Sequence, residues 1–138
     1  MSMRQNLITL ALLISLGGTA HADIFAAGPV YGGNTTDLTG GVVTCRVFNA
    51  GLTSATINLT QIWANTNVLV TPTANTCLTN GVNPPLGSAK YCAFTAPITG
   101  NFAYSCRINA IGYDTNIRGV AEVYGVSGKI LNAQPLLK

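Results

Sequence analysis

Most of the chain after residue 23 consists of short runs of Val, Ile, Thr, Tyr and Phe that are separated by Gly, Asn and Pro. No sustained apolar stripe with helical spacing follows the first 22 residues. β-Branched and aromatic residues favour strands, whereas Gly, Asn and Pro favour the turns between strands. The pattern therefore predicts an all-β fold of about seven to eight antiparallel strands packed as two sheets.

The turn residues set the expected strand boundaries. The expected strands cover residues 24–30, 42–49, 55–64, 68–71, 90–95, 101–111, 117–124 and 129–136, with an irregular loop at 73–89 and turns at 112–116 and 125–128. Side chains alternate between the two faces of a strand, which assigns one inward set to each run. The expected inward sets are Val43, Cys45 and Val47; Ala55, Ile57, Leu59 and Trp63; and Phe102, Tyr104, Cys106 and Ile108.

The first 22 residues have the three parts of a secretory signal peptide. Arg4 supplies a positive start, an apolar run extends from Leu7 to Leu16, and Ala20 and Ala22 are small residues at the cleavage positions. This run is about half of the roughly 20 apolar residues that a membrane-spanning helix needs. We therefore expect cleavage after Ala22, a secreted or periplasmic location, and a mature single domain of residues 23–138 without a membrane span.

Four cysteines lie in the expected mature domain: Cys45, Cys77, Cys92 and Cys106. An even number of cysteines in an exported chain indicates two disulfides, and four cysteines allow three pairings. A zinc site is disfavoured, because no pair has the C-x-x-C spacing and the one histidine, His21, lies in the signal segment. We expect neither a metal nor an organic cofactor.

The order Cys45, Trp63, Tyr104 and Cys106 resembles that of an immunoglobulin-like domain. In that family a disulfide joins two sheets and packs against a tryptophan, and a tyrosine lies two residues before the second cysteine. The resemblance implies an immunoglobulin-like antiparallel β-sandwich in which Cys45 pairs with Cys106 and Cys77 with Cys92. The signal end and the Gly-, Thr- and Asn-rich body also look like those of small, uncharacterised secreted bacterial proteins.

The residues of the expected mature domain disfavour catalysis. It has no histidine, which removes Ser-His-Asp and Cys-His arrangements. Its carboxylates are Asp23, Asp37, Asp114 and Glu122. The aspartates lie at the terminus or in turn regions, and Glu122 shares a strand face with Arg118, which is typical of a solvated or cross-strand-paired charge. An enzyme with an unusual carboxylate pair is the least favoured hypothesis, and we expect no catalytic residue.

Aromatic side chains are the candidates for a ligand-binding surface. Four tyrosines lie near strand ends or turns: Tyr31, Tyr91, Tyr113 and Tyr124. Tyrosine combines a flat apolar face with a hydroxyl, which suits a carbohydrate or a protein partner. The alternative interpretation is partly buried packing at sheet edges. The few basic residues are dispersed, so nucleic-acid binding is not expected.

These observations favour an exported, non-enzymatic β-sandwich that binds or scaffolds. The alternative is a subunit of an extracellular filament or pilus, in which residues 23–31 are added as a strand to a neighbouring sheet. Self-association of this kind is suggested by a chain that is 48% hydrophobic and only 8% charged. The sequence does not identify the ligand or partner.

Overall fold

The computed structural model describes residues 22–31, 40–65, 67–79, 82–111 and 116–137, so the expected signal segment before Ala22 lies outside the described residues. The described residues form ten strands and no helix. The strands are β1 (Ala22–Tyr31), β2 (Val42–Asn49), β3 (Ala55–Ala64), β4 (Val68–Val70), β5 (Ala74–Asn75), β6 (Pro85–Leu86), β7 (Tyr91–Pro97), β8 (Ala103–Ile111), β9 (Ile117–Tyr124) and β10 (Ile130–Leu137). This part of the chain contains no helix that is long and apolar enough to cross a membrane.

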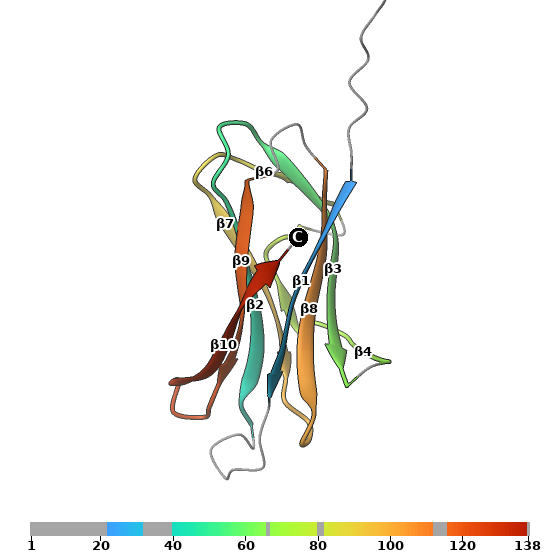
Figure 1. Cartoon of the computed structure of the whole chain (residues 1–138), viewed down its shortest axis with the longest axis vertical. Coiled ribbons are helices and arrows are strands. Elements are labelled where there is room, and N and C mark those ends of the chain that lie inside the picture. The colour runs from blue at the N-terminus through green and yellow to red at the C-terminus, as the bar shows by residue number, and fades with distance from the viewer. Residues whose placement is uncertain (1–21, 32–39, 66, 80–81, 112–115, 138) are drawn as a thin grey trace, which may run out of the picture.

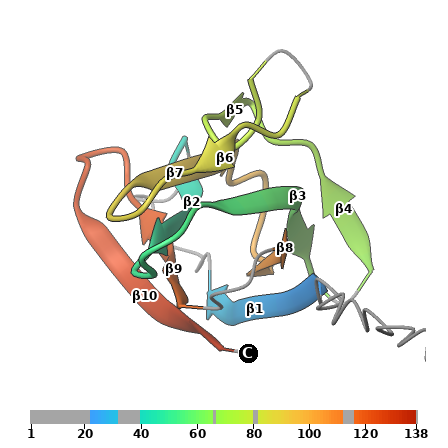
Figure 2. The same cartoon turned by 90° about the horizontal axis from the view of Figure 1, so that it is seen from above.

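Every strand pairing is antiparallel, and the pairings form one path in the order β4-β3-β8-β1-β10-β9-β2-β7-β5, with β6 beside β3. The sheet is strongly curled, so the half with β1, β3 and β8 faces the half with β2, β7 and β9 (Figures 1 and 2). Among the described residues, β1 and β10 join the two halves at two residue pairs, Ala26 with Leu137 and Ala27 with Leu136. The prediction of an all-β, antiparallel fold is confirmed.

The predicted boundaries agree with the structure for the long strands and differ in the segment 73–89. Strands β2, β3 and β9 have the bounds expected from the sequence. The segment predicted as an irregular loop contains two short strands, which raises the strand number above the expected seven to eight: β5 pairs with β7, and β6 pairs with β3. The Asn75 side chain stabilises this segment, because its Oδ1 accepts hydrogen bonds from the N–H groups of Cys77 (3.0 Å) and Leu78 (3.2 Å).

A bulge in β3 overturns part of the predicted inward face. The pairing of β3 with β8 shifts register between Ile57 and Leu59, and an extra residue reverses the alternation of side chains beyond it. Ile62 lies opposite Cys106 and is fully buried, so its neighbour Trp63 points to the other face and is only partly buried. The expectation that Leu59 and Trp63 face the interior is therefore wrong.

The expected inward position of Phe102 is also wrong, because Phe102 precedes β8 and is 37% exposed. Tyr104, two residues further along the chain, is fully buried. Its hydroxyl accepts a hydrogen bond of 3.1 Å from the backbone N–H of Thr99, so the phenol is satisfied inside the core. The edge of the Phe102 ring packs against Tyr104, with ring centroids 6.4 Å apart.

Two disulfides connect parts of the sheet, and no cysteine is free. Cys45 of β2 is bonded to Cys106 of β8, with their Cα atoms 5.9 Å apart, and Cys77 is bonded to Cys92 of β7. These are the pairs that the immunoglobulin-like resemblance implies. Strands β2 and β8 are not neighbours in the sheet, so the first bridge crosses the interior from one half to the other. Two disulfides indicate an oxidising compartment.

The core fills the space around the first bridge. Its largest fully buried apolar side chains come from both halves of the sheet and are Val30, Val43, Val47, Ile57, Ile62, Phe94, Tyr104, Ile108 and Val123. Residues 23–31, which the filament hypothesis would donate to a neighbouring sheet, pair along β8 of their own chain. The segment therefore already has a partner strand in this structure.

One fully buried polar residue, Asn49, ends strand β2. Its Nδ2 donates hydrogen bonds of 2.8 Å to the carbonyl oxygens of Thr53 and Leu86, and its Oδ1 accepts a hydrogen bond of 2.9 Å from the N–H of Gly51. The side chain thereby attaches the turn after β2 to β6. Buried polar groups with all their partners stabilise one local conformation.

We expect Asn49→Ala to lower the free energy of unfolding by about 3 kcal/mol, because three hydrogen bonds are lost and their buried partners are left unsatisfied. Equilibrium urea unfolding with the disulfides intact measures this loss. Asn101→Ala, at an exposed position, is the matched control and should change stability by less than about 0.5 kcal/mol. Equal effects of the two substitutions would contradict the role assigned to Asn49.

Candidate functional site

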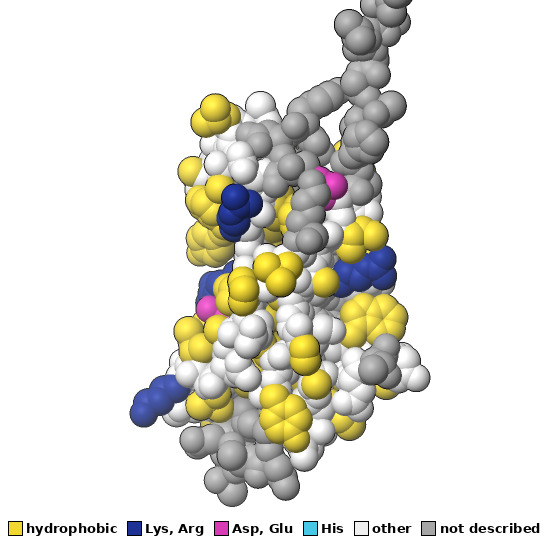
Figure 3. All heavy atoms as spheres, in the orientation of Figure 1, with side chains coloured by type: hydrophobic (Ala, Val, Ile, Leu, Met, Phe, Trp, Pro, Cys, Tyr) yellow, Lys and Arg dark blue, Asp and Glu magenta, His cyan; other side chains and the backbone are white. Residues whose placement is uncertain are grey.

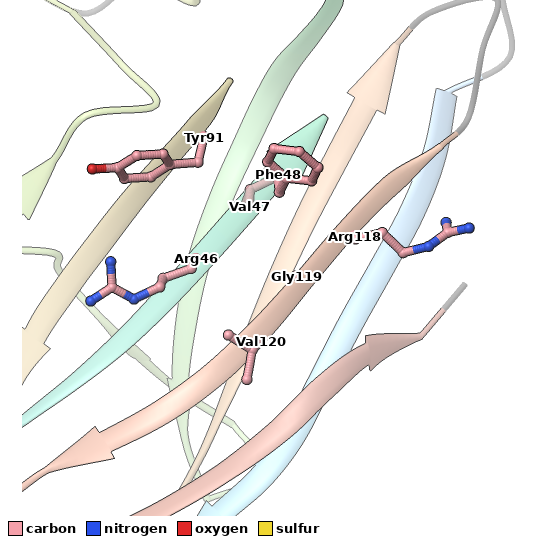
Figure 4. A pocket seen from close by; sticks show the side chains of 7 residues that line it. All are labelled: Arg46, Val47, Phe48, Tyr91, Arg118, Gly119 and Val120. Atoms are coloured by element: carbon pink, nitrogen blue, oxygen red, sulfur yellow. The ribbon is translucent and has the colours of Figure 1, made fainter. Parts of the chain in front are cut away.

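A groove of about 480 Å³ lies on the outer face of the sheet, where β2 runs between β7 and β9 (Figure 4). Its lining residues are Arg46, Val47, Phe48, Tyr91, Arg118, Gly119 and Val120. Antiparallel pairing brings these residues together, because Phe48 lies opposite both Tyr91 of β7 and Arg118 of β9, and Arg46 lies opposite Val120. The groove is therefore built from three adjacent strands.

Two exposed aromatic rings form one side of the groove. The Tyr91 side chain is 69% exposed and the Phe48 side chain is 39% exposed. Figure 4 shows the ring of Tyr91 on β7 and the ring of Phe48 on β2, with Val120 on the neighbouring strand β9. Both residues line the same groove, and ligand sites are lined mostly by hydrophobic and aromatic side chains.

Arg46 is fixed beside the groove by two partners. Its Nε donates a hydrogen bond of 2.8 Å to Oε2 of Glu122, and its Nη2 donates one of 3.1 Å to the hydroxyl of Tyr124. The Tyr124 hydroxyl in turn donates a hydrogen bond of 2.8 Å to the same Glu122 oxygen. These bonds close a triangle of three side chains on the outer face.

The triangle holds the Arg46 guanidinium in one orientation and leaves some of its donors available for a ligand. The hydrogen bonds to Tyr124 and then to Glu122 raise the pKa of the guanidinium above its usual value. The side chains of Arg46 and Glu122 are 44% and 12% exposed, so the guanidinium faces solvent while the carboxylate is largely covered. A guanidinium has five N–H donors, and the triangle occupies two of them.

Gly119 allows β9 to pack closely against its neighbours beneath the groove. A Cβ atom at this position would collide with the backbone oxygen of Arg46 and lie 2.6 Å from Cδ1 of Leu136. Leu136 is buried, so it fills the space that the glycine leaves. The residue before Gly119, Arg118, donates a hydrogen bond of 3.1 Å to the carbonyl of Ile117. Its side chain extends away from Arg46 (Figure 4).

The structure brings only part of the predicted tyrosine surface together. Tyr91 lines the groove, and Tyr124 lines a second hollow of about 320 Å³ on the other side of Arg46. Tyr31 is 53% exposed on β1 and lines neither hollow. Tyr113 lies outside the described residues. The three described tyrosines of this predicted surface therefore do not line one common hollow.

Phe48, Arg46 and Val120 were not predicted from the sequence as ligand-binding residues. The sequence does contain one indication of these residues. Side chains alternate along a strand, which places Arg46 and Phe48 on the outer face of β2. An apolar residue such as Phe48 on an otherwise polar face indicates a binding surface once the strand is known to face solvent.

Two of the four predicted carboxylates, Asp23 and Glu122, belong to the described residues, and they lie on different strands. Glu122 is paired with Arg46 across strands, as its position in the sequence suggested. Asp23 lies in β1, which is not a neighbour of the β9 strand that carries Glu122. Asp37 and Asp114 lie outside the described residues, so the carboxylate-pair hypothesis stays a prediction.

Comparison with known protein families, with curated proteins and with solved structures found no match for this chain. The geometry of the groove therefore carries the information about function. Its three components are two exposed aromatic rings, a fixed and charged guanidinium, and an apolar floor.

We expect the coupling between Arg46 and Glu122 to be about 1 kcal/mol or less and to decrease with added salt, because the guanidinium faces solvent. A double-mutant cycle with Glu122→Gln and Arg46→Gln, followed by urea unfolding at low and high salt, measures this coupling. A coupling of about 3 kcal/mol that salt does not change would instead indicate a desolvated pair and would contradict this account.

Proposed function

We propose that this chain is an exported, non-enzymatic binding module with an immunoglobulin-like β-sandwich architecture, and that it holds a carbohydrate in the groove between β7, β2 and β9. The observation that carries this proposal is the exposed pair of aromatic rings, Tyr91 and Phe48, beside the guanidinium of Arg46. Residues 1–22 would direct export, and the mature protein would act in the periplasm or outside the cell.

Two features support the immunoglobulin-like part of the proposal. The disulfide between Cys45 and Cys106 joins strands that are not neighbours, as an inter-sheet bridge does. Tyr104 lies two residues before Cys106, and its hydroxyl is bonded to the backbone of Thr99, five residues upstream. Immunoglobulin-like domains contain a tyrosine with a similar position and a similar bond, called the tyrosine corner, so this feature supports the proposed architecture.

The size of the groove favours a small ligand over a globular partner. Ligand pockets have volumes of about 300–1,000 Å³, and the groove of about 480 Å³ lies in this range. A stable protein interface covers about 800 Å² on each partner, which is a much larger surface than the seven lining residues provide. A short segment of a glycan chain matches the groove better than a folded protein.

The chemistry of the lining residues favours a sugar among small ligands. A pyranose ring has an apolar face of C–H groups that packs flat on an aromatic ring, and hydroxyls that accept hydrogen bonds at its edge. Tyr91 and Phe48 offer the rings, and Arg46 offers guanidinium donors that are held in a fixed position. Because a guanidinium also pairs with carboxylates, a uronic acid would bind more tightly than a neutral sugar.

We expect Tyr91→Ala to weaken binding of oligogalacturonate at least about tenfold, which corresponds to about 1.4 kcal/mol. Isothermal titration calorimetry measures the dissociation constant, with a neutral cello-oligosaccharide as the second probe. Tyr31→Ala is the matched control, because Tyr31 has a similar exposure but lines neither hollow.

The three outcomes of this experiment are distinct. Weaker binding by Tyr91→Ala with normal binding by Tyr31→Ala supports the groove as the carbohydrate site. Equal losses in both variants contradict the assignment to the groove. No binding of either probe by the unchanged protein contradicts a site for these sugars.

A further inference from the structure

Strand β10 has an edge that is largely without a partner among the described residues. One side of β10 pairs with β9 from Ile130 to Pro135, but on the other side only Leu136 and Leu137 pair with β1. Figures 1 and 2 both show β10 diverging from β1 toward its N-terminal end. The backbone N–H and C=O groups of residues 130–135 that do not point toward β9 therefore have no neighbouring described strand.

The composition of this edge differs from that of a protected edge. Proteins protect edge strands by keeping them short or by placing charged residues on them. Strands β4 and β5, at the two ends of the sheet, have three and two residues. In contrast, β10 has eight residues and no charged one, and only Pro135 interrupts its row of donors.

The side chains of β10 are exposed as well as its backbone. Ile130, Leu131 and Leu137 are 54%, 44% and 68% exposed. In the view of Figure 3, hydrophobic side chains are spread over the face of the molecule that carries β1 and β10, with few charged ones between them. Another strand that paired with β10 would cover both the free backbone groups and these apolar side chains.

We propose that two copies of this chain pair through their β10 edges, antiparallel, with a twofold axis close to Ala133. A second copy supplies an identical uncharged edge, so no like charges meet within the segment 130–135. Antiparallel pairing of one strand with itself is compatible with twofold symmetry, in which each copy uses the same surface. Around this axis residues 131–135 of one copy pair with residues 131–135 of the other, and Ala133 lies opposite Ala133.

The pairing has a consequence for the groove, and this consequence rests on the proposed function. A twofold axis perpendicular to the paired strands keeps the outer faces of both copies on the same side. Five strand spacings separate β2 from its copy, which is about 24 Å measured along the sheet. A glycan chain or a surface with many glycans could then occupy both sites, and the second binding event would be intramolecular.

A charge-swap experiment tests the pairing at its axis. Residues directly opposite each other in an antiparallel pair have Cβ atoms about 4.5–5.5 Å apart, so Ala133→Lys brings two positive charges together, and Ala133→Glu two negative ones. Sedimentation equilibrium from micromolar to millimolar protein measures association without any ligand. We expect a dimer for the unchanged protein and association weakened about tenfold or more for each variant alone.

Mixing the two variants gives the decisive result. An equimolar mixture of Ala133→Lys and Ala133→Glu should dimerise at least as well as the unchanged protein, because opposite charges then meet at the axis. Leu69→Lys and Leu69→Glu are the controls, since Leu69 is 54% exposed on β4 and lies far along the sheet path from β10. Circular dichroism confirms that every variant is folded.

Other outcomes overturn the proposal. These are a monomer at every concentration, an open-ended polymer, dimers that both Ala133 variants leave intact, or dissociation caused by the Leu69 variants. Sugar binding by a single copy is measured separately by calorimetry, so a failure of the carbohydrate site and a failure of the β10 pairing are distinguishable.

Discussion

The disulfide between Cys45 and Cys106 joins two strands that the pairing of the sheet does not bring together. Among the described residues, the two halves of the sheet share only the two residue pairs between β1 and β10, so hydrogen bonds alone connect them weakly. The bridge connects positions 61 residues apart, and restricting an unfolded loop of this length stabilises the folded state by about 4 kcal/mol. The core packs around this covalent link, and both cysteines are essentially inaccessible to solvent.

The candidate site depends on the same strand. Cys45 points from β2 into the protein core, so the next residue, Arg46, points outward. Phe48 follows two residues later on the same outer face. The bridge thereby fixes the strand that forms the centre of the groove, while β7 and β9 supply Tyr91 and Val120 on either side. The second bridge, between Cys77 and Cys92, holds the segment around Cys77 beside β7, which begins at Tyr91. Inner and outer faces of β2 are thus used for stability and for binding, respectively.

Local sequence pattern was sufficient to predict the long strands, because β2 and β9 alternate without interruption and are bounded by turn residues. It failed in β3, where a bulge at Asn58 reverses the alternation and moves Ile62, rather than Trp63, opposite Cys106. A bulge depends on pairing with β8, which is distant in the sequence. The short strands β5 and β6 were missed for a similar reason. Each is defined by two residue pairs with a strand that is distant in the sequence. The groove was missed because it combines residues of three strands whose order in the sheet no local pattern encodes.

Disulfide mapping measures directly whether Cys45 is bonded to Cys106 in the native protein. The protein is purified from the compartment in which it accumulates, its thiols are blocked without reduction, and its proteolytic fragments are analysed by mass spectrometry. The account predicts one linked fragment pair that contains Cys45 and Cys106, another that contains Cys77 and Cys92, and no blocked thiol. A different pairing, or Cys45 and Cys106 recovered as blocked thiols from folded protein, would contradict it.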